Sequence, residues 1–579
     1  MTMLTKWGAA LDRSCPLPEY PRPQLRRESF YNLNGIWDYA VTPSGDEPEV
    51  WDGEIVVPFS PEAPLSGAAR GPAKDEYLHY RRGFTLPEGF QKSRVLLHFG
   101  AVDQIAEVFV NGVSAAKHSG GYWPFSADIT NLLREGENIL RVTVRDNADD
   151  PTFAYGKQRY KRGGMWYTAQ SGIWQTVWLE SVPEVYVKSL RITPEFDEAR
   201  VRIELETALE SSAAITCDVR AADGSFVAGS WAKGGVCVVP LPGFRAWTPD
   251  DPYLYTLDIT CGEDRVESYF AMRKFSYVEL GGRKVFGLNN APLFHNGLLD
   301  QGYYPDGLLT PPSDEAMVND IETMKRCGFN MLRKHIKIEP LRWYYHCDRL
   351  GMIVWQDMVS GGQPYSFLHV SALPTLGKVD LPDQDAKPYG RSGVLSRARF
   401  RREMADTVRL LYNCPCIALW TVFNEGWGQF DALDMANELK KLDPTRFIDH
   451  ASGWQDQGYE EMKSRHIYFR PVKLKNDGRA LALTEYGGYI LAVDGHRWTD
   501  KVFGYRICRN SAALAHDYEK LMLGQVLPHI RKEGLTAAVY TQITDVEEEL
   551  NGLMTYDREV LKIPEETLRE INAALRFDA

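Results

Sequence analysis

The feature that most constrains this chain is a strand and helix alternation that starts near residue 284 and runs through the C-terminal half. Short apolar runs with the length of buried strands alternate with amphipathic helical patterns, and glycines mark several of the turns between them. Ser313, for example, can cap a helix that ends near Gly328, and the next strand follows at once. The expected strands are 293–295, 329–333, 352–355, 417–422, 447–448, 466–468, 481–484 and 537–540. Eight strands in about 290 residues predict a (β/α)8 TIM barrel over residues 278–579.

Two β-rich regions precede the barrel. Both show the period-two alternation of half-buried strands, as in Ile139–Val144 and Val201–Glu206. Residues 183–277 have the length and the turn spacing of a small immunoglobulin-like β-sandwich. Residues 1–182 are rich in aromatic side chains, which suit the core of a larger β-sandwich, and a few of them on loops would suit sugar rings. We therefore expect three domains.

Composition argues against several classes of function. The net charge is −12 and the basic residues are scattered, so the chain offers no basic surface for nucleic acid. It lacks a long apolar run and the pattern of a secretory signal, so we expect a cytoplasmic protein with no membrane partner. The nine cysteines are widely spaced, which favours free thiols. Cys414-Pro-Cys416 has no further ligand nearby at metal spacing, and we expect neither a metal ion nor a cofactor.

Two acidic residues at predicted strand ends indicate a chemistry. Glu425 closes the apolar run that begins at Ala418, Glu485 closes the run that begins at Ala480, and each leads into a glycine-containing turn. The loops that follow the strands of a β/α barrel converge on one face, so the two carboxylates are expected to meet there. Cleaving a glycosidic bond requires two carboxyl groups, one that moves a proton and one that meets the oxocarbenium-like carbon. Glu425 and Glu485 are therefore the candidate catalytic pair, and the alternative is a structural ion pair.

Polar and aromatic residues at the other strand ends are candidates for binding a sugar, which requires hydrogen bonds to hydroxyls and a flat apolar surface. They are Asp300, Arg333, His335, Trp355, Asp357, Asn424, Trp427, Tyr468, Gln542 and Asp545. Structural alternatives exist for several: the histidine and the tryptophans can belong to the core, and Asp357 and Asp545 can cap helices. Arg333 can simply neutralise a buried carboxylate. Near Glu485 it would also lower the pKa of that carboxyl and keep it ionised.

Motifs along nearly the whole chain carry a family resemblance. In the predicted barrel they are Asn424-Glu425 and Thr484-Glu485-Tyr486-Gly487. In the first region they are Asn32-Leu-Asn-Gly-Ile-Trp37, Val108-Phe-Val-Asn-Gly112, the stretch 120–130 and Gln170-Ser-Gly-Ile-Trp174, and in the second they are Trp247 and Pro252-Tyr-Leu-Tyr255. In this order and spacing they resemble glycoside hydrolase family 2, which includes bacterial β-galactosidases, β-glucuronidases and β-mannosidases. The resemblance implies that residues 1–182 form a sugar-binding jelly-roll β-sandwich.

The resemblance also implies roles for individual residues. Glu425 becomes the general acid/base, Glu485 the nucleophile, Asn424 the amide that holds the sugar 2-hydroxyl, and Tyr468 the hydrogen-bond donor to the nucleophile. The implied outcome is net retention through a glycosyl-enzyme, which requires carboxyl groups about 5–5.5 Å apart. Glu425 must start protonated. We expect an apolar surround from Trp420, Phe423 and Trp427 to raise its pKa.

Departures from the family pattern bear on the substrate. Family glucuronidases grip the sugar carboxylate with Asn-x-Lys after strand eight, and here Asn551-Gly-Leu-Met-Thr-Tyr556 contains no lysine, which disfavours a uronic acid. Lys334 or Lys337 could still meet an anionic group. The long stretch 359–393 after strand three is expected to wall the pocket.

The expected function is a retaining exo-β-glycosidase acting on a carbohydrate, galactosidase-like or specific for another neutral hexose. The alternatives are a transglycosylase, a β-uronidase and a non-catalytic carbohydrate-binding protein. Family members often form dimers or tetramers, so the resemblance also allows a homo-oligomer.

Overall fold

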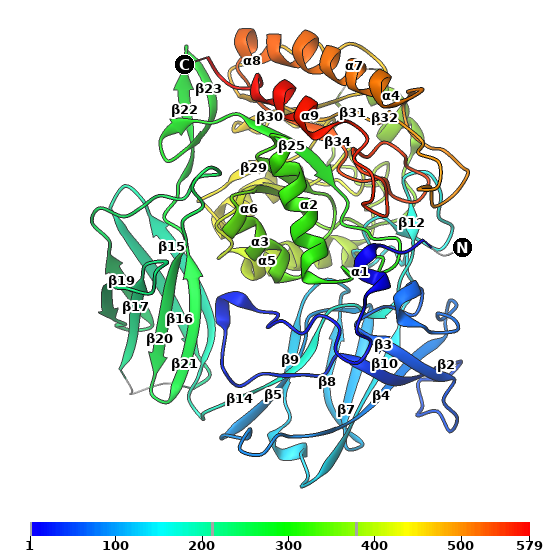
Figure 1. Ribbon diagram of the computed structural model, residues 1–579, viewed down its shortest axis with the longest axis vertical. Helices are drawn as coiled ribbons and strands as arrows, with labels where there is room; N and C mark the ends of the chain where they lie inside the picture. The colour runs from blue at the N-terminus through cyan, green and yellow to red at the C-terminus, as the bar shows by residue number, and fades with distance from the viewer. Residues whose placement is uncertain (1–2, 210–213, 377–379, 579) are drawn as a thin grey trace.

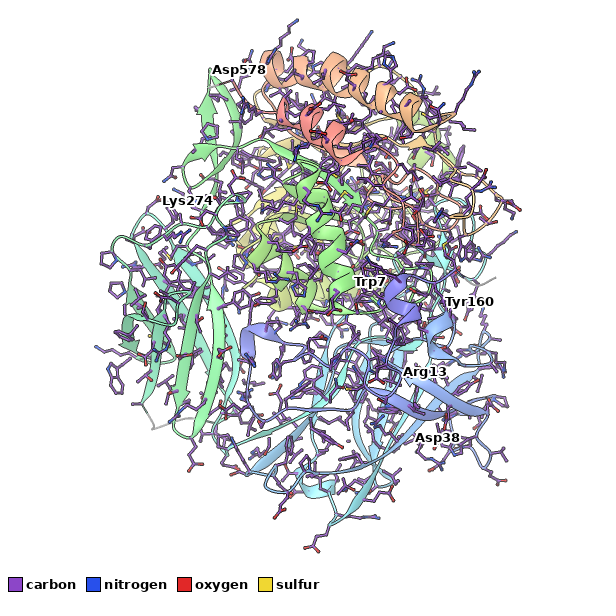
Figure 2. The ribbon with its side chains drawn as sticks, in the orientation of Figure 1. Trp7, Arg13, Asp38, Tyr160, Lys274 and Asp578 are labelled. Atoms are coloured by element: carbon purple, nitrogen blue, oxygen red, sulfur yellow. The ribbon has the colours of Figure 1, made fainter. Side chains whose placement is uncertain are left out.

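The computed structural model describes residues 3–209, 214–376 and 380–578. Two β-sandwiches, coloured blue to cyan and cyan to green, lie against a barrel that continues the colour scale to red (Figure 1). Side chains fill the space between the three parts (Figure 2). The site described below depends on how these parts meet.

The first sandwich packs a six-stranded antiparallel sheet against a four-stranded one. The larger sheet has the order β3 (Gly53–Val57), β2 (Gly35–Thr42), β4 (Tyr77–Thr85), β10 (Glu137–Arg145), β7 (Ile105–Val110) and β8 (Val113–Ser119). The smaller sheet has the order β1 (Tyr31–Asn32), β14 (Val177–Val182), β5 (Arg94–Phe99) and β9 (Phe125–Asp128). Leu140, Val142 and Val144 of β10 are buried in the core, as their period-two spacing predicts. Two short pairs lie toward the barrel: β6 (Val102–Asp103) with β13 (Gly172–Ile173), and β11 (Gln158–Arg159) with β12 (Tyr167–Thr168).

The second sandwich has seven strands in two antiparallel sheets, as expected of an immunoglobulin-like domain. One sheet has the order β15 (Val187–Glu195), β16 (Arg200–Thr207) and β19 (Val236–Pro240), and the other β18 (Phe226–Trp231), β17 (Ile215–Arg220), β20 (Tyr255–Cys261) and β21 (Asp264–Phe270). Three of the nine cysteines lie in its apolar core. No disulfide joins the cysteines of the described residues, and all of them except Cys15 are buried.

The barrel is one parallel sheet of eight strands. Its order is β29 (Phe447–Asp449), β28 (Ile417–Thr421), β27 (Ile353–Asp357), β26 (Met331–Lys334), β25 (His295–Asp300), β34 (Leu535–Thr541), β31 (Ala480–Gly487) and β30 (Met462–Ile467). Every residue of β27, β28 and β31 is buried, which explains their continuous apolar runs. β29 and β30 are the two edges of the sheet, and Ser464 Oγ crosses between them to donate to Asp449 Oδ1 at 2.9 Å. The eight predicted strands are therefore confirmed, with shifted ends.

Helices surround this sheet: α2 (Asp314–Arg326), α3 (Leu341–Leu350), α5 (Val394–Leu411), α6 (Ala432–Leu442), α7 (Ser511–Leu521), α8 (Leu527–Glu533) and α9 (Glu565–Ala573). Ser313 caps α2 as predicted, since its Oγ accepts from the Ala316 N–H. A small antiparallel sheet of β22 (Phe275–Leu280), β23 (Arg283–Leu288) and β24 (Ala291–Pro292) covers the amino ends of the barrel strands. Phe286 of β23 stacks there on Phe447, the first residue of β29, with ring centroids 4.2 Å apart.

Buried polar contacts join the three parts. Arg27 donates to Glu180 of β14 at 3.1 Å and to both carboxylate oxygens of Asp264 of β21 at 2.9 Å, which ties the two sandwiches together. Lys274, labelled in Figure 2, pairs with Asp197 where the second sandwich approaches the barrel. The expected fold class, a jelly-roll sandwich followed by an immunoglobulin-like sandwich and a TIM barrel, is confirmed.

Candidate active site

The two candidate glutamates lie at the carboxyl ends of barrel strands. Glu485 belongs to β31, and Glu425 follows β28 in a left-handed backbone conformation with φ of 55°. That conformation is uncommon outside glycine and costs about 1–3 kcal/mol. The Glu425 N–H donates to the Ser452 carbonyl at 2.9 Å, and the Glu425 carbonyl accepts from Trp454 Nε1 at 2.8 Å. The loop after β29 thus holds Glu425 in a strained conformation at the barrel rim.

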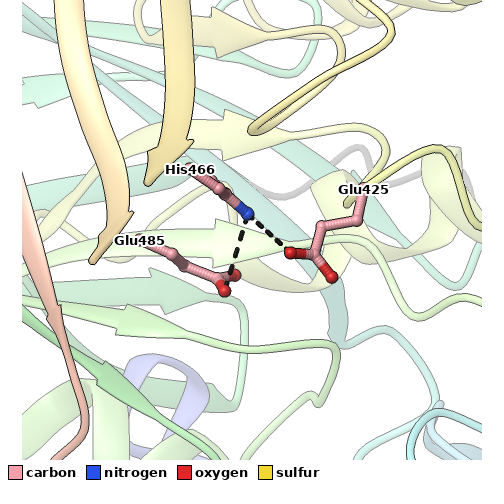
Figure 3. A group of neighbouring side chains, drawn as sticks. All are labelled: Glu425, His466 and Glu485. Carbon is pink, nitrogen blue, oxygen red and sulfur yellow. Dashed lines mark hydrogen bonds and ion pairs between the residues drawn. The ribbon is translucent and has the colours of Figure 1, made fainter. Parts of the chain in front are cut away.

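The two carboxylates approach each other across the imidazole of His466 (Figure 3). His466 Nδ1 lies 2.8 Å from Glu425 Oε1 and 3.5 Å from Glu485 Oε2. An oxygen of one glutamate lies within 4.8 Å of an oxygen of the other. A separation of about 5 Å suits attack by one carboxylate on a sugar whose leaving group is protonated by the other. These three side chains are also, among the residues that the structure describes, the set spaced closely enough to share a metal ion.

Each oxygen of Glu485 accepts a hydrogen bond. Arg333 Nη1 donates to Oε1 at 3.2 Å, and the Tyr468 hydroxyl donates to Oε2 at 2.8 Å. The Tyr468 oxygen also lies 2.8 Å from Thr541 Oγ1, and the ring stacks on Tyr505 with centroids 4.0 Å apart. The carboxylate is therefore oriented from both sides.

Arg333 is fully buried and organises the floor of the site. Besides Glu485 it donates to both oxygens of Asp357 at 3.0 Å, to Asn424 Oδ1 at 2.8 Å and to the Thr484 carbonyl at 3.1 Å. All five guanidinium N–H groups are thereby used. Because the Asn424 oxygen is taken by Arg333, the amide nitrogen is the end that can donate to a ligand.

His335 belongs to the same network. Its Nδ1 lies 2.8 Å from Asp357 Oδ2, and burial lowers its pKa to about 3, so the ring is neutral at physiological pH. Arg333, Asp357, Asn424 and His335 therefore form one polar unit behind the glutamates.

Burial raises the pKa of both catalytic candidates. For Glu425, burial is the largest cause, and the charges of Lys157 and Arg333 act against it. For Glu485, burial is again the largest cause; Glu425 adds to it, whereas His466 and Arg333 act to lower the pKa. Arg333 thus acts to lower the pKa of Glu485, as predicted, but the net shift is upward. Desolvation of a fully buried carboxyl outweighs the nearby guanidinium.

The expected apolar surround of Glu425 is only partly present. Trp420 donates from Nε1 to Asp443 at 2.9 Å, and Phe423 stacks on Phe400 of α5, so both face the outer helices. Trp427 packs instead against Trp166 and Tyr155 of the first sandwich, with ring centroids 5.1 and 5.7 Å away. The burial of Glu425 therefore depends partly on that domain.

Other predicted residues have partners inside the protein. Trp355 is fully buried, and its Nε1 donates to His295 Nδ1 at 3.0 Å. Asp300 accepts from Lys334 at 2.7 Å, and Asp545 accepts from Lys562 at 2.6 Å.

The lysines that were candidates for an anionic ligand are engaged in the same way. Lys334 and Lys337 both donate to Glu339 at 2.8 Å, and Lys337 also donates to the carbonyls of Gly302 and Leu309. Their ammonium groups are satisfied inside the protein.

Gln542, by contrast, belongs to a chain of amides after β34. Its Oε1 accepts from Gln301 at 3.0 Å, and its Nε2 donates to Asn551 Oδ1 at 2.9 Å. Asn551 Nδ2 and Gln301 Oε1 are buried without a partner among the described residues. A buried amide group without a partner is costly.

A loop of the first sandwich approaches Glu425, although the predicted site residues all come from the barrel. Lys157, in this loop, is 8% exposed; its nearest polar contact is Met165 Sδ at 4.0 Å, and its charge acts on Glu425 and Glu549. The Tyr167 hydroxyl donates to Glu549 Oε2 in a short hydrogen bond. Tyr167 and Glu549 lie 382 residues apart in the sequence, and sequence periodicity carries no information about such a contact.

The long stretch after β27 packs beside that loop. Its Ser360 carbonyl accepts from the main-chain N–H of Tyr155, and its Gly362 carbonyl accepts from the Tyr155 hydroxyl at 2.8 Å. Farther along, Gln455 of the loop after β29 donates to the His369 carbonyl at 2.7 Å. The stretch thus bridges the first sandwich and the loop that holds Glu425.

Three family models match the chain. Residues 64–183 match the model described as the sugar binding domain of glycosyl hydrolases family 2, residues 185–273 match the model described as glycosyl hydrolases family 2, and residues 311–473 match the TIM barrel domain of that family. Among the described residues, no helix has the length and apolar character needed to cross a membrane.

Similar proteins are named as β-galactosidases, β-glucuronidases and β-galacturonidases. A β-galactosidase of Thermoanaerobacter pseudethanolicus is 25% identical to this chain, and the match covers 63% of this chain and 47% of the relative. A β-glucuronidase of Paenibacillus borealis is 22% identical, and the match covers 82% of this chain and 85% of the relative. The chain spans about half the length of the β-galactosidases with the strongest matches. A solved β-glucuronidase from an uncultured Clostridium sp. superposes with a TM-score of 0.75 at 19% identity, covering 95% of this chain and 99% of that one. A β-galacturonidase from Eisenbergiella tayi superposes with a TM-score of 0.70 at 19% identity, covering 97% and 100%.

Proposed function

Because the chain belongs to glycoside hydrolase family 2, we propose that it is a retaining exo-β-glycosidase with Glu485 as nucleophile and Glu425 as general acid/base. The observation that carries the proposal is the approach of the two carboxylates to within 4.8 Å, with Arg333 and Tyr468 bonded to Glu485. A binding protein has no need for a proton donor opposite a nucleophile. This argues against the non-catalytic alternative.

The first step joins the enzyme to the sugar. Glu485 attacks the anomeric carbon while Glu425 gives its proton to the leaving oxygen, and a glycosyl ester forms on Glu485. Burial raises the pKa of Glu425 and thus favours the protonated form that this step requires. Asn424 is placed to donate to the 2-hydroxyl, an interaction that strengthens in the transition state.

The second step releases the sugar. Glu425, now a carboxylate, takes a proton from water, the water oxygen bonds to the anomeric carbon, and the ester bond to Glu485 breaks. Tyr468 and Arg333 stabilise the departing carboxylate because both donate to its oxygens. A second sugar in place of water would make the enzyme a transglycosylase, which only acceptor measurements distinguish.

We propose a neutral hexose as the glycone, as in the β-galactosidase relatives. The segment after β34 supplies the carboxylate of Glu549 and the amides of Gln542 and Asn551, which suit hydroxyl groups. A second carboxylate from the sugar would be repelled by Glu549. Lys334 and Lys337 are already bonded to Glu339 and offer no compensation.

One observation favours a β-uronide as a second candidate. Lys157 is almost buried, and among the described residues no carboxylate lies within ion-pair distance of its ammonium group. A buried cation without an anionic partner is costly, and a substrate carboxylate would provide one. The similar solved structures include β-glucuronidases and a β-galacturonidase, although at 19% identity they support the fold alone.

A panel of nitrophenyl glycosides tests the proposal. Wild type is expected to release nitrophenol from a β-glycoside and not from the α-anomer. The glycone is identified by the substrate with the highest kcat/KM among the galactoside, glucoside, mannoside, glucuronide and galacturonide. Proton NMR of the first product should show the β-anomer. Glu485→Ala should abolish release, and Glu425→Gln should slow it most for poor leaving groups. Equal rates for wild type and both variants would refute the assignment.

A further inference from the structure

Resting on that proposed function, we infer that His466 is a positioning residue whose Nδ1–H group, beside the nucleophile, donates to the acid/base and strengthens that bond as negative charge moves from Glu485 to Glu425 during the first step. His466 lies in β30 and was not among the residues expected from sequence. Its side chain is fully buried between the two carboxylates. Figure 3 shows its ring nitrogen facing both.

The fold makes room for the His466 ring beside Gly453. Gly453 has φ of +94°, and a Cβ there would lie 2.4–2.6 Å from three atoms of the imidazole. Any other residue at 453 would therefore displace the ring. The Trp454 ring packs against the imidazole, with ring centroids 5.5 Å apart. His466 lies opposite Glu485 in the parallel pairing of β30 with β31, just after a shift in register. A ring placed in this way is held by its neighbours rather than free to rotate.

The hydrogen bonds fix which nitrogen carries the proton. Burial lowers the pKa of His466 to about 4, so at neutral pH the ring carries one proton. Nε2 lies 3.3 Å from Ser452 Oγ, which can donate to it, whereas Nδ1 faces carboxyl oxygens of the two glutamates, which can accept. The proton therefore belongs on Nδ1. The other charged groups that act on the ring are Arg333, Asp357 and Arg465, from β26, β27 and β30.

This arrangement bears on the proton of Glu425. An N–H that donates to Oε1 leaves Oε2 as the oxygen that carries and transfers the proton. When that proton moves to the leaving oxygen, Glu425 becomes charged and its bond from His466 becomes charge-assisted. At the same moment Glu485 loses its charge by forming the ester. The donor thus stabilises the Glu425 carboxylate as it becomes ionised, without a proton of its own being transferred.

Two substitutions test this inference. His466→Phe keeps a ring but removes the donor, and His466→Asn keeps a donor near the position of Nδ1. Because a donor to Oε1 stabilises the carboxylate, its loss should raise the pKa of Glu425 and move the basic limb of the pH profile of kcat/KM to higher pH. His466→Phe should lower kcat/KM by about 100-fold on a phenyl glycoside, which needs acid catalysis, and far less on a dinitrophenyl glycoside. His466→Asn should restore most of both properties.

His346→Phe is the matched control, since His346 is a buried histidine of α3 whose Nε2 lies 2.8 Å from Asp314 Oδ2. It should leave the leaving-group dependence and the pH profile unchanged. The inference is wrong if His466→Phe slows both substrates equally with an unmoved basic limb, or if His466→Asn behaves like His466→Phe. Full activity of Glu485→Ala would instead overturn the proposed function, so the two failures are distinguishable.

Discussion

At the scale of single residues, the site contrasts a half-buried carboxyl, Glu425, with a buried one, Glu485, and the two have different partners. Glu485 accepts from Arg333 and Tyr468, which favour its charged form, whereas Glu425 meets one donor, His466, and a distant cation, Lys157. The pKa of each is raised by burial. The proposed acid, Glu425, has the more exposed side chain (20% against 7%), so the number of hydrogen-bond donors distinguishes it from the proposed nucleophile more clearly than burial does.

Removing the Tyr468 hydroxyl should slow departure of the Glu485 carboxylate. A hydrogen bond to a charged group contributes about 1.5–3 kcal/mol, so Tyr468→Phe should reduce kcat roughly 10- to 100-fold. Because release of the sugar is affected, a burst of nitrophenol should precede the slow steady state in stopped-flow measurements. Tyr486→Phe is the control: that hydroxyl contacts Met522 Sδ, outside the site. Equal rates for the two variants would show that the Tyr468 hydroxyl has no catalytic role.

Removing the charge of Lys157 should shift the basic limb of the pH profile of kcat/KM. The Lys157 ammonium lowers the pKa of Glu425, so Lys157→Met should raise that pKa and move the basic limb of kcat/KM to higher pH. If the glycone is a uronide, kcat/KM should also fall steeply for that substrate. Lys161→Met, an exposed change in the same loop, should alter neither property. An unmoved basic limb in Lys157→Met would show that this cation does not act on Glu425.

At the scale of elements, the loop after β29 positions the proposed acid/base and the imidazole beside it. Ser452 and Trp454 hold the backbone of Glu425, and Gly453 leaves space for His466. The element itself was predictable, because 447–448 reads as a strand. Its function was not, because the contact of Gly453 with His466 depends on the register of β30 against neighbouring strands.

Alanine substitutions at two glycines of this loop distinguish the effect of backbone strain from the effect of displacing the His466 ring. Gly453 and Gly458 both have positive φ, but a Cβ at 458 meets nothing within 4 Å. Both alanine variants should lose about 1–2 kcal/mol of stability, as seen by thermal melting. Only Gly453→Ala should lose most of its kcat/KM, because it displaces the imidazole. Similar activity in both variants would contradict this account of the loop.

At the scale of the whole molecule, the barrel supplies the carboxylates and the first sandwich completes the site. Glu425 and Glu485 could be predicted from sequence because each ends an apolar strand beside a glycine. Lys157 and Tyr167 could not, since they reach the site through packing between domains. Trp355 was a candidate for binding a sugar because it lies near the end of a predicted strand, but its indole N–H donates to His295 inside the barrel.

The junction of the two sandwiches depends on a buried ion cluster. Arg27→Ala would leave Glu180 and Asp264 with less compensation, at a cost of about 3–5 kcal/mol. Burial alone would raise the pKa of Glu180, but Arg22, His98 and Arg27 outweigh it and the net shift is downward. Stability from this carboxylate is therefore present above its unfolded pKa and is lost as the pH falls through its folded pKa.

Thermal melting of wild type, Arg27→Ala and Arg26→Ala checks this junction. Arg26 forms an exposed pair with Glu267, so its loss should cost less than about 1 kcal/mol. Arg27→Ala should melt at a clearly lower temperature, and its deficit should shrink on acidification. Equal melting temperatures would show that the cluster does not stabilise the junction.

The most direct test of the central claim is to trap the glycosyl-enzyme. A 2-deoxy-2-fluoro glycoside of the preferred glycone, with dinitrophenol as leaving group, should inactivate the enzyme and add one sugar to its mass. Peptide mapping by mass spectrometry should place that sugar on Glu485. A label on another residue, or steady turnover of a good substrate with no covalent intermediate and with inversion at the anomeric carbon, would contradict the account.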